Sequence, residues 1–222
     1  NRSYKQDDYN QYFQDIQVPA NGQKRFYLYI PISSYYTADL TLRISSGKDY
    51  RDEKVQYTLA QNYDTIISIL NRQKGGLAYL TGYKSIIPPN SSIYVTYPDP
   101  QKLPVLWHCY KNIDILFIND LPSLNLDNER EKAILDYVRG GGSLVFSTNL
   151  DPGEFNGSLF RDYLPLIPQS TKVACEDTKN AFNAASTVLM SGKLNGTIIG
   201  SVGNSPVLVQ KRVGEGNIFF IT

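Results

Sequence analysis

The residues that could carry chemistry lie where four apolar, strand-like segments end. Asn71, Asp99, Asp120 and Asn149 follow these segments, and Asp151 comes two residues later. Open parallel sheets bind ligands beyond the carboxyl ends of their strands, so these side chains are expected to share one binding rim. Carboxylate oxygens are ligands for Ca²⁺ and Mg²⁺, and the three aspartates could hold such a cation. The alternative is structural, because Asn and Asp also end strands where they suit turns.

A nucleophile with its base is the second chemistry to consider. His108 is the only histidine and is adjacent to Cys109. Neighbouring residues point about 100° apart on a helix and to opposite faces on a strand, so this pair cannot share a proton. Ser147 and Thr148 carry strand-end hydroxyls, but no imidazole has an argued place beside them. Cys175, the other thiol, could pair with Cys109 or stay free. The sequence therefore assigns no catalytic residue, metal site or cofactor.

The elements that must position these groups are centred on residues 113–149. Residues 113–120 and 143–148 are apolar runs of strand length, and 127–139 has helical periodicity. Asp127 is the expected N-cap of this helix, and Gly140 is expected to take the left-handed conformation after its last turn. Together these segments predict a β-α-β unit whose strands are buried on both faces of a parallel sheet.

Other apolar runs extend this sheet to an α/β domain over residues 61–222. The predicted parallel strands before the central unit are 66–70 and 92–97, with a short helix after Gly75-Gly76 and a helical turn within 103–110. The region after Asp151-Pro152-Gly153, including the polar stretch 170–186, is expected to be irregular. Three closing strands are predicted at 196–202, 207–213 and 217–222, and a glycine-bearing hairpin joins the last two.

The first 60 residues have a different pattern. Residues 1–14 are polar and tyrosine-rich, and are expected to be frayed or a linker. Apolar residues then alternate with polar ones in 26–30, 40–44 and 55–59. This period of two predicts three strands of a small antiparallel subdomain with one solvent-exposed face.

Charge and composition narrow the classes of partner. The 222 residues include 22 basic and 21 acidic side chains, a formal net charge of +1, which gives no electrostatic footprint for nucleic acid or an anionic membrane. No run approaches the roughly 18 apolar residues of a membrane helix. The chain begins without Met and resembles a piece of a longer protein, so membrane attachment is expected only through segments outside it.

The motifs 113–120, Arg139-Gly-Gly-Gly142, Ser143-Leu-Val-Phe146 and the terminal 213–220 hairpin resemble the class I glutamine amidotransferase-like domain. More narrowly, the chain is similar to the version in bacterial membrane-anchored proteins of unknown function. The resemblance implies a flavodoxin-like fold after a short β module, and an extracytoplasmic location in the full-length protein.

Active amidotransferases carry a cysteine at a tight turn after a strand, with histidine and glutamate downstream. The matching turn here, 146–149, has Ser147 and Thr148 in place of cysteine, and His108 lies upstream. We therefore expect a catalytically inactive interaction or scaffold module with a protein partner. The alternatives are a metal-dependent hydrolase that uses the strand-end carboxylates, and a small-molecule or carbohydrate sensor.

Overall fold

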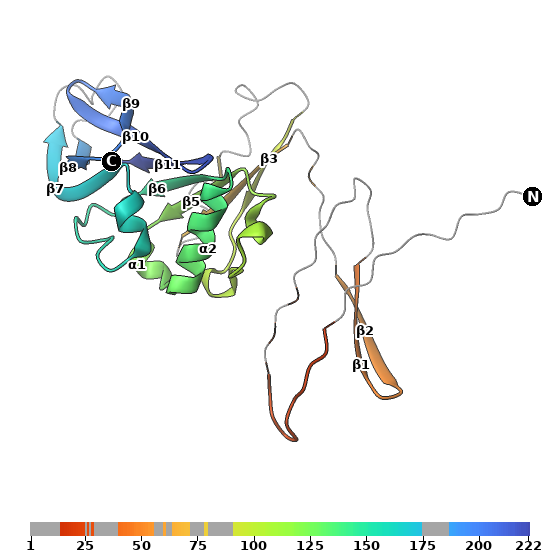
Figure 1. Ribbon diagram of the computed structural model, residues 1–222. Coiled ribbons are helices and arrows are strands. Elements are labelled where there is room, and N and C mark those ends of the chain that lie inside the picture. The colour runs from red at the N-terminus through yellow and green to blue at the C-terminus, as the bar shows by residue number, and fades with distance from the viewer. Residues whose placement is uncertain are drawn as a thin grey trace, which may run out of the picture. The chain divides into compact units, whose positions relative to one another are not determined.

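The structure, a computed structural model, describes residues 14–24, 26, 28, 40–55, 60, 64–71, 78–79, 91–174 and 187–222. Contacts divide the chain into two compact units, Asn1–Gln56 and Tyr57–Thr222 (Figure 1). Each unit is described by itself below.

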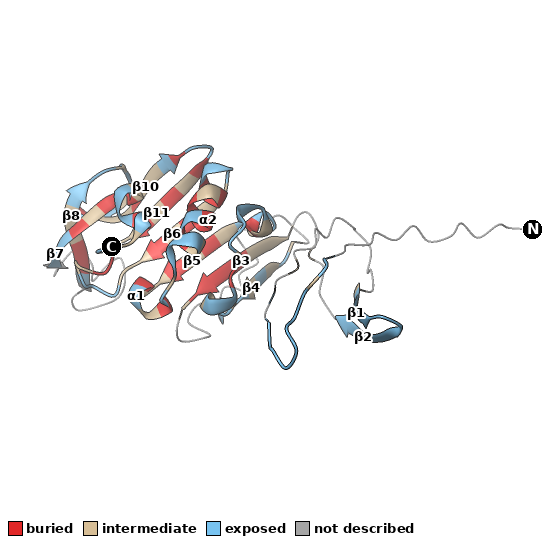
Figure 2. Cartoon of the chain, turned by 60° about the horizontal axis from the view of Figure 1, so that its bottom comes forward, coloured by how far each residue is buried: buried red, intermediate tan, exposed pale blue. Residues whose placement is uncertain are grey.

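The described part of the first unit holds one β-hairpin, whose first strand contains the predicted strand 40–44; of the predicted strand 55–59, only Val55 is described. β1 (Leu40–Ser46) pairs antiparallel with β2 (Asp49–Val55) around a turn at Gly47, whose φ is +61°. Phe26 and Leu28 are not in a strand, and the rest of the predicted first strand, like most of the 1–14 segment and residues 56–59, lies outside the described residues. The hairpin is exposed on both faces apart from the half-buried Leu40 (Figure 2).

A cross-strand ion pair contributes to β2, a strand that the sequence pattern did not predict. The guanidinium of Arg43 binds both carboxylate oxygens of Asp52 at 2.7 Å. Opposite charges on facing strand residues stabilise a hairpin without any apolar face. Apolar alternation could not locate this strand, because β2 consists mainly of charged residues.

The second unit is built on a seven-stranded sheet in the order β4-β3-β5-β6-β11-β10-β9 (Figure 1). The first five strands in this order are parallel, and β10 pairs antiparallel with both β11 and β9. Their bounds are Thr65–Leu70 for β3, Ile93–Thr96 for β4, Ile115–Asn119 for β5, Ser143–Ser147 for β6, Thr197–Val202 for β9, Ser205–Val213 for β10 and Gly216–Ile221 for β11. All seven predicted strands of this unit are confirmed.

The helices among the described residues are few and short for so large a sheet. α2 (Asn128–Arg139) packs against β11, and the other described helices are single turns. These are η2 (Pro100–Lys102), η3 (Trp107–Tyr110), α1 (Leu121–Leu124) and η4 (Leu159–Tyr163). The helix predicted after Gly75-Gly76 lies outside the described residues except for Ala78 and Tyr79, which have 3₁₀ geometry. Within the described residues, no helix has the length and apolar character needed to cross a membrane.

β5, β6 and β11 are fully buried on one face only, which corrects the expectation of two buried faces for the strands of the central unit, whereas β3 is buried on both faces over its last four residues. Leu116, Ile118, Leu144, Phe146 and Phe220 are inaccessible to solvent and form the core with α2 (Figure 2). The alternate residues of β5, β6 and β11 are half-buried. Apolar side chains on both faces led to the wrong expectation, because hydrophobicity does not report how many helices cover a sheet.

The ends of α2 agree with the sequence at the N-terminus and differ at the C-terminus. The side chain of Asp127 accepts a hydrogen bond from the amide of Arg130 at 2.8 Å, as predicted for an N-cap. Gly140 has a φ of −83°, and Gly141 is the left-handed residue with a φ of +112°. The amide of Gly140 still donates to the backbone carbonyl of Asp136, so the left-handed residue that ends the helix comes one position later than predicted.

The region predicted to be irregular contains two long strands. β7 (Leu166–Ala174) and β8 (Thr187–Leu194) form a separate antiparallel pair. The register shifts between Pro168 and Ser170, which interrupts the alternation of apolar residues. Leu189 and Met190 are buried side by side in sequence, so these strands lack the period of two that would have revealed them.

Candidate functional site at the carboxyl ends of the strands

The carboxyl ends of β5 and β6 bring several of the predicted site residues together. Asn119 and Ser147 are partners in the parallel register, and the hydroxyl of Ser147 donates to Oδ1 of Asn119 at 3.0 Å. Asp120 and Thr148 come directly after these strands. This edge of the sheet is the position at which open α/β proteins bind ligands.

Three of the five predicted rim residues form one chain of hydrogen bonds. Nδ2 of Asn149 donates to the carboxylate of Asp120 at 3.0 Å. Oδ1 of Asn149 accepts from the amide of Asp151 at 2.9 Å, and the carboxylate of Asp151 accepts from the amide of Gly153 at 2.8 Å. These polar groups hold the loop after β6 in shape, as expected for Asn and Asp in turns.

Glu154 is the residue at this rim that sequence reasoning missed. Its side chain is only 5% exposed, and it accepts three hydrogen bonds. Oε1 accepts from the amide of Leu121 at 3.2 Å, and Oε2 accepts from the hydroxyl of Thr148 and the amide of Asn149, both at 2.9 Å. Burial raises the pKa of Glu154 above its ordinary value, against the opposite effect of these hydrogen bonds. No period or motif around residue 154 marks a buried carboxylate.

The hydroxyl of Thr148 is occupied on both sides. It donates to Glu154, and it accepts from the amide of Leu150 at 2.9 Å. The proton of the Thr148 hydroxyl and one of its two lone pairs are therefore engaged within the protein. Thr148 holds the loop after β6, while Ser147 bonds the end of β5.

Left-handed backbone occurs after both strands, but not at the predicted elbow residues. Asp120, between β5 and α1, has a φ of +54°, and Leu150 has a φ of +67°. This conformation costs a leucine about 1–2 kcal/mol. Strain of this kind is found at functional sites, and both residues border the network around Glu154.

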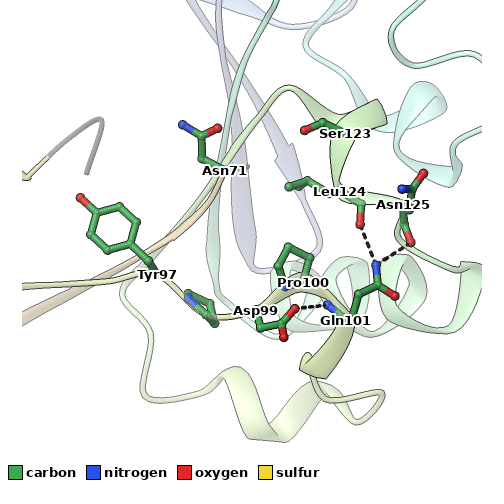
Figure 3. A pocket seen from close by; sticks show the side chains of 9 residues that line it. Asn71, Tyr97, Asp99, Pro100, Gln101, Ser123, Leu124 and Asn125 are labelled. Carbon is green, nitrogen blue, oxygen red and sulfur yellow. Dashed lines mark hydrogen bonds between the residues drawn. The ribbon is translucent and has the colours of Figure 1, made fainter. Parts of the chain in front are cut away.

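Asn71 and Asp99 belong to a separate part of the rim. They border a cleft of about 360 Å³ with Tyr97 and residues 123–125 (Figure 3). The carboxylate of Asp99 accepts from the amide of Gln101 at 3.0 Å, which caps η2. Nε2 of Gln101 donates across to the carbonyl of Leu124 at 2.9 Å. The cleft thus lies between the carboxyl ends of β3 and β4 on one side and the end of α1 on the other.

The only histidine lies near the amino ends of the strands, opposite the rim. η3, which contains His108, precedes β5, and its Trp107 shares a groove with Asp114 and Ser143 at the amino ends of β5 and β6. Ser147 is at the other end of β6, a strand of five residues that spans roughly 16 Å. The imidazole cannot act as a base for the strand-end hydroxyls.

Cys109, the one cysteine among the described residues, adds no nucleophile to the rim. Cys109 is a free, half-buried thiol in η3, and burial raises its pKa. Cys175 lies outside the described residues. Because the thiolate is the reactive form, a raised pKa makes Cys109 less nucleophilic.

The possible cation site does not form as a cluster. Among the described residues, no three His, Cys, Asp or Glu side chains are grouped so that they could hold a metal ion. Asp99 borders the cleft, while Asp120 and Asp151 belong to the hydrogen-bond chain around Asn149.

Comparison with known proteins gives no family for the chain. No protein-family model and no curated protein matches it. Among solved structures it is similar to Cytoplasmic Protein STM1381 from Salmonella typhimurium LT2, with 13% identity over 83% of each chain and a TM-score of 0.45. It is also similar to the exo-beta-1,4-mannosidase Op5Man5 from Opitutaceae bacterium strain TAV5, with 13% identity over 70% of this chain and 30% of that chain and a TM-score of 0.41. Scores below 0.5 carry no conclusion about function.

Proposed function

We propose that this chain is a non-catalytic interaction module that binds a protein partner at the carboxyl-end rim of its sheet. The observation that carries the proposal is the separation of possible nucleophile and base. His108 precedes β5 and lies at the amino ends of the strands. Ser147 and Thr148 lie at the carboxyl ends, with their hydroxyls in internal hydrogen bonds. A hydroxyl without an adjacent base is a poor nucleophile at neutral pH.

The proposal includes a flavodoxin-like, amidotransferase-like fold. The five parallel strands, numbered along the chain, have the spatial order 2-1-3-4-5, which is the order of flavodoxin-like sheets. The scarcity of helices is a departure from that fold. The motif resemblance also supports an extracytoplasmic module of a membrane-anchored bacterial protein. Protease accessibility of the full-length protein in intact spheroplasts tests this location, and protection from the protease would contradict it.

A second candidate function is a sensor for a small polar ligand. Tyr97 borders the cleft, and its hydroxyl is the one buried side-chain oxygen or nitrogen without a hydrogen-bond partner among the described residues. An unmet buried hydroxyl costs about 1–3 kcal/mol, and a polar ligand would recover this cost where its binding turned Tyr97 toward the cleft. A sensor should show a ligand-dependent rise in melting temperature that is lost in Tyr97→Phe.

Two measurements test the leading proposal. Purified chain should release no more product than a buffer blank from glutamine, aryl esters or aryl glycosides, with or without Mg²⁺ and Ca²⁺. Activity that disappears in Thr148→Val would contradict a non-catalytic role.

The second measurement locates the partner. A photo-cross-linking residue in place of Lys102, which is exposed on η2 beside the cleft, should capture a partner in the native host. The matched control is the same replacement at Lys111, at the amino-end edge of the sheet. Equal capture from both positions, or capture from Lys111 alone, would contradict partner binding at the rim.

A further inference from the structure

The outer edge of β9 is paired with no other strand of the described structure. β9 is the last strand of the seven-stranded sheet and pairs only with β10 among the described residues. Its sequence, Thr-Ile-Ile-Gly-Ser-Val, contains no charge and no proline. Soluble proteins usually protect such edges with charged residues, proline or a covering element, because unpaired backbone groups accept any free strand.

Both faces of β9 present apolar side chains to solvent. Ile198 is 44% exposed and Ile199 is 47% exposed, and successive strand residues point to opposite faces. An added strand would therefore gain backbone hydrogen bonds together with apolar contacts on both sides. Strand addition of this kind is a known mode of protein recognition.

The other sheet edges among the described residues differ in these respects. In the β7–β8 pair, β7 contains Pro168 and Lys172, and β8 contains Lys193. β4, at the opposite edge, has only four residues and is followed by Pro98, which cannot donate a ladder hydrogen bond. The β1–β2 hairpin carries Arg43, Asp52 and other charges along its length. β9 is thus the edge in the described structure with the fewest obstacles to pairing.

We propose that β9 pairs antiparallel with β9 of a second copy of this chain, which joins the two sheets across a two-fold axis. An antiparallel pair of identical strands is self-complementary, as a two-fold interface requires. An uncharged strand brings no like charges together at the axis, and a net charge of +1 gives two copies little mutual repulsion. Six paired residues bury little area, so the dimer should be weak and dependent on concentration.

The test compares two isoleucine-to-lysine variants by analytical ultracentrifugation from micromolar to near-millimolar concentration. Ile199→Lys places a charge within the paired strand of each copy and should raise the dimer dissociation constant by about tenfold or more. Ile44→Lys makes the same change at an exposed strand position of β1 and should leave the constant unchanged. Unaltered melting of both variants at low concentration shows that they fold.

Hydrogen exchange gives an independent reading of the same contact. Amides of residues 197–202 should gain protection when the wild-type concentration rises, and those of β4 should not. A wild-type chain that stays monomeric throughout the range would overturn the proposal, even if it bound a foreign strand. A dimer that Ile199→Lys does not weaken would overturn it as well.

Discussion

The carboxylate of Glu154 accepts a hydrogen bond from the hydroxyl of Thr148 at 2.9 Å, and its other oxygen accepts from the amide of Leu121. One buried side chain thereby connects the loop after β6 to the start of the helix after β5. This connection explains why the rim has a defined shape although its residues come from short, irregular segments. It also makes the rim sensitive to changes at a residue that no motif contains.

Removal of the Glu154 side chain should destabilise the second unit. Glu154→Ala leaves three donors without an acceptor and opens a cavity, and each unmet buried donor costs about 1–3 kcal/mol. We expect a loss of about 3 kcal/mol or more in the free energy of unfolding, measured in urea. Glu215→Ala removes an exposed glutamate that pairs with Arg212, and should change this free energy by less than about 0.5 kcal/mol. Similar losses in the two variants would show that the Glu154 network is not important for stability.

The same carboxyl should give the protein a recognisable pH dependence. Burial raises the pKa of Glu154 above its ordinary value of 4.5, so the folded protein keeps this proton at a pH where the unfolded chain has lost it. The stability contributed by the group is complete below pH 4.5 and is lost as pH rises through the folded pKa. Glu154→Gln does not titrate, so wild type should lose stability relative to this variant as pH rises from 4.5.

The measurement is urea unfolding of both proteins at a series of pH values. Wild type should also lose stability relative to Glu131→Gln as pH rises, because burial raises the pKa of Glu131 in the folded protein. A difference between wild type and Glu154→Gln that stays constant with pH would contradict the raised pKa.

Leu150 should limit stability through its backbone conformation. Asn tolerates a left-handed φ better than Leu does, so Leu150→Asn should raise the free energy of unfolding by up to about 1 kcal/mol. Leu150 is also 38% exposed beside the rim, so the variant should weaken cross-linking of a partner from position 102. Leu159→Asn, at a similarly exposed leucine without positive φ, should not stabilise the chain. A destabilised Leu150→Asn variant would show that the leucine side chain outweighs the strain.

Gly216 should tolerate no side chain, because two backbone segments meet there. A Cβ at this position would lie 2.1 Å from the carbonyl oxygen of Val138 and 2.2 Å from that of Gly142. Gly216→Ala should therefore separate β11 from α2 and cost several kcal/mol of unfolding free energy. In Gly200→Ala the nearest atom, Cβ of Leu208, is 3.4 Å away, so this control should cost about 1 kcal/mol or less. Equal melting temperatures for the two variants would contradict the close packing at Gly216.

Local patterns were sufficient for the strands and helix at the centre of the chain. The apolar runs of β5 and β6 and the cap of α2 at Asp127 depend on neighbours in sequence, and the structure has them where they were predicted. The predictions were wrong where longer-range contacts decide. β2 pairs with β1 along its whole length, with Arg43 and Asp52 facing each other, and β7 and β8 pair with each other across residues 175–186.

The sequence by itself determined that this protein contains parallel strands with polar residues at their carboxyl ends, and that its one histidine precedes the strand-end hydroxyls. Tertiary structure alone decided that Asp120, Asn149 and Asp151 share one hydrogen-bond chain while Asn71 and Asp99 border a separate cleft. It also brought Glu154 under the rim. The physical reason is that periodicity reports which face of an element is apolar, whereas the partners of a buried polar group are set by how separate elements pack.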